Sequence, residues 1–571
     1  MKLFAELYRR LDSATSTRAK HAALVDAFRA SRVRPASAAW LVYFLAGGKP
    51  RQSAPTRVLR RLALDEAGLP EWLFEECYQN VGDLAETLSL LLPMGESAED
   101  APLDVWMRER LLPLRALDDD AKYQRLAAYA RALPEDERLV FFKLITGALR
   151  VGVSRLQVVK ALAEVAGVDE KHMAQRMMGY AQAGRSPAAG DFDALVAGVA
   201  NTEGAALDAG QPYPFYLAQS WSRPVEEMQA ALGSPKDWIA EWKFDGIRAQ
   251  LLKREGGWRL WSRGEELISE SYPDLEPLAH ALPVGSALDG ELVVLMRAAN
   301  AQPDSLDGLM PFASLQQRLG RKILSAKTLA ALPVAFIAYD LLEAGGRDLR
   351  ETPQSERRAA LETLVERLLA ADPTLPLRLS PEVKGETWAE LAQRREEARA
   401  LGREGLMLKA RAGAYGVGRR KGDDRTDVWW KWKLDPMSVD AVLIYAQRGH
   451  GRRSGVYSDY TFALWNGEPE APTRELVPFA KAYSGLSDAE MREVDAIIRR
   501  TTVESFGPVR SVTPTLVFEL GFEGLQISKR HKSGVAVRFP RMLRWRRDKP
   551  VAEADTLAIL KALLPAARDE G

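Results

Sequence analysis

The stretch Glu241-Trp-Lys243-Phe-Asp245-Gly246-Ile-Arg248 is the most informative segment of the sequence. Polar and hydrophobic residues alternate from Trp238 to Leu252, which predicts a β-strand with Glu241 and Lys243 on one face. The Asp-Gly pair indicates a tight turn, and a lysine where a strand meets such a turn projects into a cleft. An amine must be uncharged to act as a nucleophile, and nearby cations or burial favour that state. We therefore predict that Lys243 is a nucleophile.

The segments around this stretch predict an α+β domain. Further short strands and one helix are expected in the middle third of the chain: strands at Ala287–Leu295, Val334–Leu342 and Gly405–Lys409, and a helix at Ser355–Leu369. These runs are bounded by turn residues and have the lengths typical of strands and of a helix.

The first two hundred residues are predicted to be helical. Hydrophobic residues recur at helical spacing from Leu139 to Leu149, after the start signal at Pro134–Glu137. A second helix is expected to begin after Ser154, a favourable N-cap, and to end near Gly167. Between residues 186 and 214 the chain is rich in Ala, Gly, Asp and Pro, so we expect a linker there.

After Lys433 the pattern changes to short, regularly spaced strands with one helix. The expected strands are Val439–Tyr445, Tyr460–Trp465, Val477–Tyr483 and Thr515–Leu520, and the expected helix is Asp488–Arg500. Such a set suits a small β-barrel. The sequence thus predicts three domains, at residues 1–205, 206–433 and 434–571.

The composition narrows the classes of partner. The 571 residues carry 79 Lys and Arg against 78 Asp and Glu, so a nucleic acid would have to be held by local basic patches. The one cysteine, Cys77, excludes an internal disulfide and a zinc site built on several cysteines. No run of about 20 apolar residues predicts a membrane helix. We expect a cytoplasmic protein without a membrane partner, and a monomer by default.

Several motifs follow Lys243 in a fixed order, each at a predicted strand end or turn. They are Ser262-Arg263-Gly264-Glu265, Asp289-Gly290-Glu291, Phe336-Ile-Ala-Tyr339-Asp340, Glu404-Gly405-Leu-Met-Leu-Lys409 and Trp430-Lys431-Trp432-Lys433. Each alone is as well explained by an exposed turn or a core aromatic. Together they closely resemble the nucleotidyltransferase motifs of ATP-dependent DNA ligases.

The resemblance extends over nearly the whole chain. Thr146–Val153 and the helix after it resemble the DNA-binding domain of the larger ligases, and Arg538–Lys549 resembles the last motif, carried on an OB domain. The resemblance implies an all-α N-terminal DNA-binding domain, an α+β adenylation domain of ATP-grasp-like type and a β-barrel OB-fold domain. It also implies that ATP, Mg²⁺ and nicked double-stranded DNA are bound.

The resemblance assigns roles to individual residues. Lys243 would attack the α-phosphate of ATP and carry AMP covalently. Glu241 would read the adenine edge, and Phe336 would stack on its face. The remaining expected ligands of ATP are Arg248, Arg263 and Glu291 at the ribose and flanking phosphates, and Lys409, Lys431 and Lys433 near the α-phosphate. Glu291 and Glu404 would hold Mg²⁺, because a hard cation prefers oxygen ligands.

Two further sets of basic residues are expected to contact phosphate. The loop before Lys431 is longer than is usual in the family, so its nucleotide-binding arginine is either Arg425, which has the expected spacing, or Arg419 or Arg420. In the last motif Arg546, Asp548 and Lys549 would approach the β- and γ-phosphates when the OB domain closes about a hinge near Asp435.

A nick-sealing enzyme must ignore base sequence, so DNA contacts should be mainly to phosphate. Four basic groups are candidates for these contacts: Arg150, Arg318–Lys322, Arg448–Arg453 and Lys529–Lys532. The sequence does not indicate the repair or replication pathway, the protein partners or the tolerance of RNA at the nick.

Other functions fit the sequence less well. An NAD⁺-dependent ligase is excluded because that family carries a four-cysteine zinc module. An mRNA-capping enzyme or an RNA ligase uses the same lysine chemistry, but the long helical N-terminal region argues against both. A DNA-end-binding protein without catalysis is disfavoured because each expected catalytic residue is present. A P-loop ATPase is disfavoured because the sequence lacks G-x-x-x-x-G-K-[ST].

Overall fold

The computed structural model describes most of the chain, and the parts it describes form two compact units. It leaves out residues 15, 51, 94–100, 148, 150, 182–184, 198–209, 297–305, 320–323, 419–427, 450–454, 469–470, 472, 484, 507–508 and 565–571. The first unit comprises Met1–Arg51, Ala101–Glu109 and Arg150–Leu434, and the second comprises Gln52–Asp100, Arg110–Leu149 and Asp435–Gly571. The helical region predicted as residues 1–205 contributes to both units.

The first unit begins with helices, as predicted for this region. They are α1 (Lys2–Ser13), α2 (Thr17–Ser31), α3 (Pro35–Leu45), α7 (Leu103–Val105), α10 (Arg155–Ala166), α11 (Glu170–Arg176) and α12 (Ala189–Val196). The predicted start and end of α10 are confirmed: Ser154 forms a capping box with Gln157, and Gly167 ends the helix in the left-handed conformation at φ 68°. The expectation of a linker from residue 186 was wrong in part, because α12 lies inside it.

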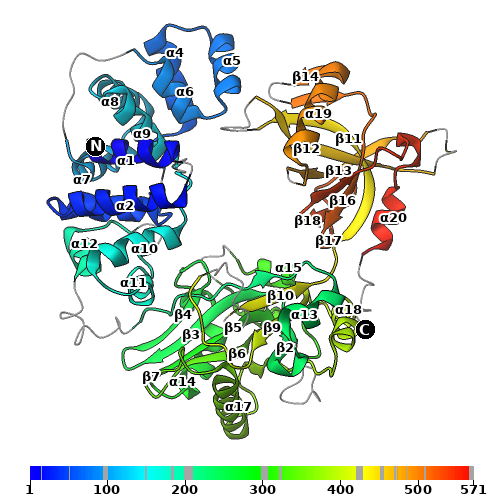
Figure 1. Ribbon diagram of the computed structural model, residues 1–571. Coiled ribbons are helices and arrows are strands. Elements are labelled where there is room, and N and C mark those ends of the chain that lie inside the picture. The colour runs from blue at the N-terminus through cyan, green and yellow to red at the C-terminus, as the bar shows by residue number, and fades with distance from the viewer. Residues whose placement is uncertain are drawn as a thin grey trace. The chain divides into compact units, whose positions relative to one another are not determined.

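The rest of the first unit is built on two sheets (Figure 1). The larger sheet has the order β4-β3-β5-β6-β7, with β8 beside β6, and the smaller has the order β1-β10-β9-β2. The strands of the larger sheet are β3 (Ile247–Arg254), β4 (Gly257–Ser262), β5 (Ser286–Val294), β6 (Val334–Ala344), β7 (Arg347–Asp348) and β8 (Leu377–Leu379). Those of the smaller are β1 (Gln219–Ser220), β2 (Trp238–Trp242), β9 (Gly405–Ala410) and β10 (Trp429–Lys433).

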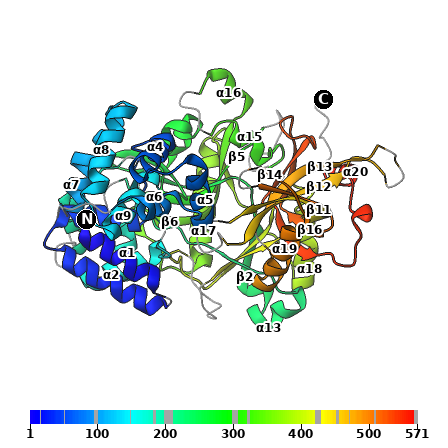
Figure 2. The same cartoon turned by 90° about the horizontal axis from the view of Figure 1, so that it is seen from above.

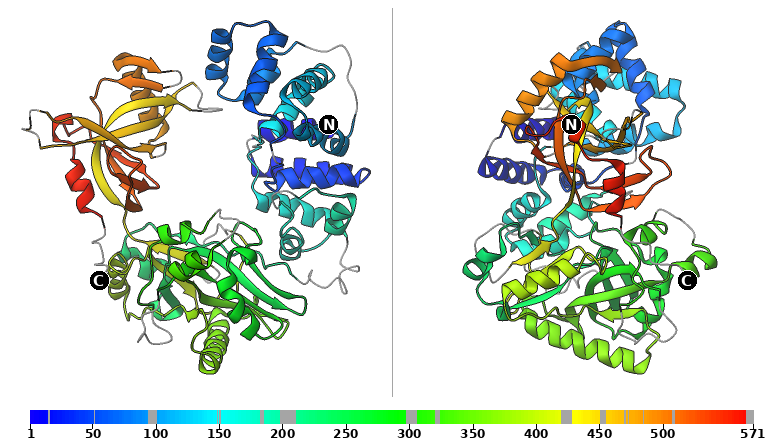
Figure 3. Two further views of the ribbon diagram at one scale, coloured as in Figure 1. Left: turned by 180° about the vertical axis from the view of Figure 1, so that it is seen from behind. Right: turned by 90° about the vertical axis from the view of Figure 1, so that its right-hand side faces the viewer.

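Hydrophobic clusters show how these sheets are covered. One face of the larger sheet packs on α14 (Glu276–Ala281) and α17 (Gln354–Ala371), with Leu251, Leu288 and Phe336 in the shared core. Figure 3 shows α17, in yellow-green, running along this face. The outer face of the smaller sheet packs on α13 (Met228–Leu232) and α18 (Trp388–Glu397). Two short helices complete the region: α15 (Phe312–Gln316) and α16 (Ala326–Ala331).

A third cluster lies between the inner faces of the two sheets. It joins Leu252 and Leu342 of the larger sheet to Trp429 of the smaller sheet, with Tyr216 and Tyr415 packed among them. The predicted single strand from Trp238 to Leu252 is divided into β2 and β3 by residues 243–246. Lys243 therefore lies at the point where the chain leaves the smaller sheet for the larger one.

The second unit has a helical part and a strand-rich part. The helices are α4 (Thr56–Ala67), α5 (Glu71–Val81), α6 (Leu84–Leu91), α8 (Asp119–Arg131) and α9 (Glu135–Thr146), and a π-helical turn spans Trp106–Leu111 between the units. The expected helix after Pro134 is confirmed as α9, which ends at Gly147 with φ 68°.

The strand-rich part begins at Asp435 and confirms the predicted elements there (Figure 2). Its sheet has the order β13-β12-β11-β15-β14, with β16 joining β11 to β19, and β17 and β18 form a separate pair. The strands are β11 (Met437–Arg448), β12 (Tyr457–Trp465), β13 (Leu476–Ala482), β14 (Thr502–Phe506), β15 (Val509–Val512), β16 (Val517–Phe522), β17 (Gly524–Ile527), β18 (Val535–Arg538) and β19 (Arg541–Trp545). Helix α19 (Asp488–Thr501) contacts β12 and β15, and α20 (Leu557–Ala562) follows near the end.

Candidate active site

Lys243 is held by its backbone on both sides. Its amide donates to the carbonyl of Gly405 at 2.8 Å, and the amide of Glu404 donates to the carbonyl of Lys243 at 2.8 Å. Gly405 has φ 123°, and a side chain there would lie 2.3 Å from the carbonyl oxygen of Trp432. Glycine is therefore required at the strand start that fixes Lys243. The lysine ammonium contacts the carboxylate of Glu404 directly.

The face of the larger sheet that is turned toward the smaller one carries polar groups. Arg248 pairs across the sheet with Glu291, and Gln250 pairs with Asp289. Because side chains alternate along a strand, these residues share a face opposite the hydrophobic core of α14 and α17. The sequence motifs around Arg248 and Glu291 thus come together on neighbouring strands.

Arg248 is the best-connected cation of this face. Its guanidinium donates to both oxygens of Asp289 at 3.1 and 2.7 Å, to the carbonyl of Tyr216 at 2.5 Å and to the hydroxyl of Tyr415 at 3.2 Å. It also lies 5.3 Å from the ring centre of Phe215. Burial opposes the charge on Arg248, but Asp289 and the two tyrosines, Tyr339 and Tyr415, raise its pKa well above the ordinary value.

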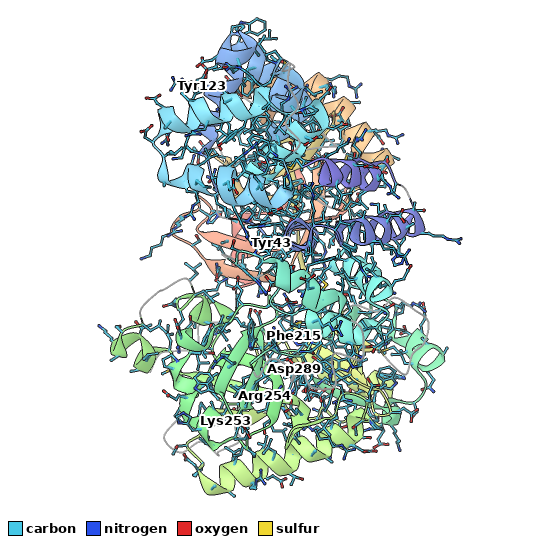
Figure 4. The ribbon with its side chains drawn as sticks, turned by 90° about the vertical axis from the view of Figure 1, so that its left-hand side faces the viewer. Tyr43, Tyr123, Phe215, Lys253, Arg254 and Asp289 are labelled. Carbon is cyan, nitrogen blue, oxygen red and sulfur yellow. The ribbon has the colours of Figure 1, made fainter. Side chains whose placement is uncertain are left out.

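Figure 4 labels Phe215 and Asp289, which both contact Arg248. The carboxylate of Asp289 is fully buried and also accepts from the hydroxyl of Tyr415 at 2.6 Å. These contacts bind the segment before β1 and the segment after β9 to the centre of the larger sheet. Tyr415 was not expected from the sequence, because an isolated tyrosine after a strand carries no recognisable signal.

Glu291 is a carboxylate in an unfavourable environment. Burial raises the pKa of Glu291 to about 7, while the charges of Lys243 and Arg248 oppose the rise. Asp289 and Glu404 raise it further by repulsion. A carboxyl group whose ionised form lacks enough compensating charge is suited to receive a cation.

The register of the smaller sheet fixes the spacing of its lysines. Lys433 lies opposite Gly405, whose other neighbour is Lys243, and Lys431 lies opposite Met407, whose other neighbour is Glu241. Both lysines are half-buried. The predicted proximity of Lys431 and Lys433 to the nucleophile is therefore consistent with the strand order.

Lys409 lies beside Glu241 and Tyr339. It is four residues along β9 from Gly405, a separation of about 13 Å at the usual rise of a strand. Its ammonium contacts Glu241 at 2.5 Å and donates to the carbonyl of Tyr339 at 3.0 Å. This lysine is 1% exposed and paired with Glu241, and its expected proximity to the α-phosphate stays a prediction.

Phe336 has to be corrected. The side chain is fully buried in the core shared with Leu251 and Leu361, on the α17 face of the larger sheet. Tyr339 is three residues further along β6 and lies on the opposite face, beside Lys409 and Trp429 at 4.4 and 6.4 Å. Adenine stacking by Phe336 was therefore a wrong prediction, and Tyr339 is the aromatic residue of this motif that faces the polar groups.

The other arginines predicted to bind the nucleotide are Arg263 and one of Arg425, Arg419 and Arg420. Arg263 is exposed, and its amide donates to the carbonyl of Arg248 at 2.9 Å, which places it at the end of β4 nearest the site. Arg425, Arg419 and Arg420 lie outside the described residues.

The last motif lies in the second unit and is anchored there by Asp440. Arg546 and Lys549 both contact this carboxylate, at 2.6 and 2.8 Å. Arg546 also pairs with the exposed Asp548 at 2.8 Å, which lowers the pKa of Asp548 to about 2. The three predicted residues of this motif thus form one ionic cluster.

The basic groups expected to contact DNA differ in exposure. Arg318 is 2% exposed, donates to both oxygens of Asp274 at 3.1 and 2.6 Å, and is therefore a structural residue. The residues of Lys529–Lys532 are exposed at the turn between β17 and β18. Arg448 is half-buried, and Arg150 lies outside the described residues, as do residues 320–323 and 450–454.

The described residues lack two features of other protein classes, a membrane-spanning helix and a cluster of metal-binding side chains. No helix among them is long and apolar enough to cross a membrane. No group of three or more His, Cys, Asp or Glu side chains that could hold a metal was found in the described part of the chain. Glu291 and Glu404 form a pair of carboxylates around Lys243, which fits a Mg²⁺ ion that takes its other ligands from water and phosphate.

Three family models match the chain in succession. They are "DNA ligase N terminus" at residues 1–163, "ATP dependent DNA ligase domain" at residues 216–433 and "ATP dependent DNA ligase C terminal region" at residues 453–549. The segments that they leave unmatched are residues 164–215, 434–452 and 550–571.

Curated proteins and solved structures agree with these models. A "Probable DNA ligase" of Koribacter versatilis is 32% identical over 95% of this chain and 93% of its own length. A "Probable DNA ligase" of Anaeromyxobacter sp. (strain K) is 31% identical over 89% and 94%. The solved structure "Pmar-Lig_PreS3" has the same fold at a TM-score of 0.57, with 16% identity over 95% of this chain and 99% of its own.

Proposed function

Because the chain belongs to the family of ATP-dependent DNA ligases, we propose that Lys243 is the residue that carries AMP between ATP and DNA. The enzyme uses ATP to seal nicks in duplex DNA through an adenylated intermediate. The observation that carries the proposal is the position of Lys243, between its contact with Glu404 and the polar face formed by Arg248 and Glu291.

The proposed reaction has three transfers at phosphorus. The uncharged amine of Lys243 bonds to the α-phosphorus, the bond to the β-phosphate oxygen breaks, pyrophosphate leaves and the amine loses a proton. The 5′-phosphate at the nick then displaces the lysine and takes AMP. Finally the 3′-hydroxyl loses its proton, bonds to the 5′-phosphorus and releases AMP. Negative charge increases around phosphorus each time, so fixed cations lower the barrier.

The chain's own residues divide this work according to their positions. Lys431 and Lys433, on β10, supply positive charge. Across one residue of β9, Lys431 is in register with Glu241 and Lys433 with Lys243. Arg248 donates four hydrogen bonds to Asp289, Tyr216 and Tyr415, so we assign it mainly to hold this face of the larger sheet in place. Arg263 is exposed at the end of the neighbouring strand and is available to phosphate.

The base end of the nucleotide site is proposed from a different group of residues. Tyr339 is half-buried on the polar face, and it takes the stacking role that was expected of Phe336. Glu241 is on β2, two residues before Lys243, and would accept from the amino group of adenine. This orientation puts the base beside Tyr339 and the phosphates beside Lys243.

Mg²⁺ is part of the proposal. Glu291 and Glu404 would hold the ion, which would supply positive charge to the phosphates of ATP. Two carboxylates are few for a calcium site but usual for Mg²⁺, which keeps several waters. Binding of the ion would also favour the ionised form of Glu291, whose pKa is raised to about 7 by burial.

For the second unit we propose an OB-fold domain at residues 434–571 that closes on ATP and later binds DNA. The cluster of Arg546, Asp548 and Lys549 on Asp440 would approach the β- and γ-phosphates. A helical DNA-binding domain at residues 1–205, a monomeric state and a cytoplasmic location complete the proposal.

The proposal is tested by the order of the steps. A nick that already carries AMP on its 5′-phosphate should be sealed by Lys243→Ala, because only the last transfer remains. The same variant should fail to seal an ordinary nick with ATP. Sealing of the ordinary nick by this variant would show that another residue carries AMP.

A further inference from the structure

The carboxylate of Glu241 contacts two cationic side chains, one at each oxygen. Arg358, on the second turn of α17, donates to one oxygen at 2.7 Å, and the ammonium of Lys409 contacts the other at 2.5 Å. The three side chains are each less than 10% exposed. A buried carboxylate is costly unless it is paired, and here two cations pair with one anion.

Arg358 is itself held in place. Its Nε donates to Glu362, one turn along α17, at 2.6 Å. The start of the same helix is joined to the chain after β9, because the amides of Gln354 and Ser355 donate to Gly413 and Arg411, both at 2.9 Å. The direction from which Arg358 meets Glu241 is therefore fixed by a helix anchored at its first turn.

The neighbouring Arg357 strengthens this anchor without contacting Glu241. It donates to both oxygens of the fully buried Asp340 at 2.8 and 3.0 Å and to Gln354 at 2.6 Å. Two successive arginines of α17 thus bind carboxylates of two separate motifs. Nothing in the sequence indicates this, since Arg357 and Arg358 are two charged residues near the start of a predicted helix.

We propose that Arg358 is a positioning residue that orients Glu241 and thereby sets the selectivity of the enzyme for adenine. This inference rests on the proposed function, in which Glu241 reads the base. An ionised carboxylate only accepts hydrogen bonds. Adenine offers an amino group at C6, whereas guanine offers an oxygen, which a fixed carboxylate repels.

The orientation matters because selectivity depends on a defined acceptor. With Arg358 in place, one oxygen of Glu241 is occupied from the α17 side and the other from the Lys409 side. Without Arg358 the carboxylate is held by Lys409 alone and can rotate toward it. A site that hydrogen-bonds a substrate group rejects analogues that lack the group, but only while the acceptor stays in position.

The test compares ATP with purine riboside triphosphate, which lacks only the 6-amino group. The rate of lysine adenylation by ATP, or of the equivalent nucleotidylation by the analogue, gives a ratio of kcat/KM values for each variant. Arg358→Gln should lower this ratio about tenfold or more, mainly through KM for ATP. Arg358→Lys keeps a cation and should recover most of it. Arg367→Gln, an exposed change on the same helix, should leave it unchanged.

A double-mutant cycle separates positioning from general damage. In a Glu241→Gln background, adding Arg358→Gln should not change the ratio further, because Arg358 acts through that carboxylate. If Arg358→Gln does not fold, Arg358→Met, which keeps the aliphatic volume, replaces it.

An unchanged ratio in the folded Arg358 variant, or an equal loss in the Glu241→Gln background, overturns the inference. Failure of the proposed function would look different. The wild-type enzyme would then take no label from ATP at all.

Discussion

The ammonium of Lys243 contacts the carboxylate of Glu404, and the backbones of the same two residues are joined by a hydrogen bond of 2.8 Å. This double connection links the end of β2 to the start of β9. It keeps the proposed nucleophile next to a group that would also hold Mg²⁺. The two roles imply that Glu404 exchanges its contact with lysine for a contact with the ion as ATP binds.

Replacement of Glu404 by glutamine should slow lysine adenylation at least tenfold. The change removes the charge of a metal ligand while keeping the size of the side chain, and losses of this order are usual when charge at a phosphoryl-transfer site is disturbed. The rate should be measured over a range of Mg²⁺ concentrations, and the variant should need more of the ion. Glu397→Gln, an exposed change on α18, is the control, and equal rates in both variants would refute the assignment.

The raised pKa of Glu291 predicts how the stability of the metal-free protein changes with pH. Burial raises its pKa from 4.5 to about 7, so the folded protein holds a proton on Glu291 that the unfolded chain releases near pH 4.5. The contribution of Glu291 to stability is therefore complete below pH 4.5 and is lost as the pH rises through 7. The side chain of Glu291→Gln stays uncharged throughout this pH range.

The melting temperature of the wild type without Mg²⁺ should accordingly fall relative to Glu291→Gln between pH 5 and pH 8. Thermal unfolding of the two proteins in matched buffers measures the difference. A constant difference across this range would show that the carboxyl group has an ordinary pKa.

Phe336 and Tyr339 form a matched pair of aromatic substitutions. Phe336→Ala should lower the free energy of unfolding by about 3–5 kcal/mol, because it leaves a cavity in a closed core. Tyr339→Ala should instead raise KM for ATP with a smaller loss of stability. Denaturant unfolding and adenylation kinetics of both variants decide between them. A KM effect confined to Phe336→Ala would restore the stacking role to Phe336.

Arg155 and Glu265 connect α10 to the turn that carries Arg263. Arg155 contacts the carboxylate of Glu265 and donates to the carbonyl of Met177 at 2.6 Å, and burial lowers the pKa of Arg155 to about 10. Glu265 has φ 62°, a conformation that costs energy for a residue other than glycine unless contacts hold it. Loss of the contact should therefore loosen the turn.

Arg155→Ala and Glu265→Ala should each raise KM for ATP, and the double variant should be no worse than the worse single one. Steady-state adenylation measures this, with Lys160→Ala on the exposed side of α10 as the control. Additive effects would mean that the two residues act separately.

Much of this fold could be predicted because its elements carry local signals. The capping box of Ser154, the alternation before Lys243 and the spaced strands after Lys433 each correspond to an observed element. The order of motifs also identified the nucleophile candidate and its neighbours. These signals are contained in a few consecutive residues, so they can be read without knowledge of the partner strands.

The sequence is least informative about which face a side chain occupies and which partner it meets. Tyr339 comes three positions after Phe336 on β6, so alternation puts the two side chains on opposite faces, but the sequence does not say which face is polar. Lys409 pairs with Glu241 because β9 lies beside β2, a long-range contact. The proposed role of Arg358 likewise depends on a long-range contact, between α17 and β2.

Covalent transfer of AMP to Lys243 can be measured with ATP labelled at the α-phosphate, Mg²⁺ and purified protein, followed by a denaturing gel. The wild type should take label that is absent from Lys243→Ala and is discharged by unlabelled nicked DNA. Any AMP already bound is first removed with pyrophosphate. Label retained by Lys243→Ala, or a wild type that takes none, would show that Lys243 does not carry AMP.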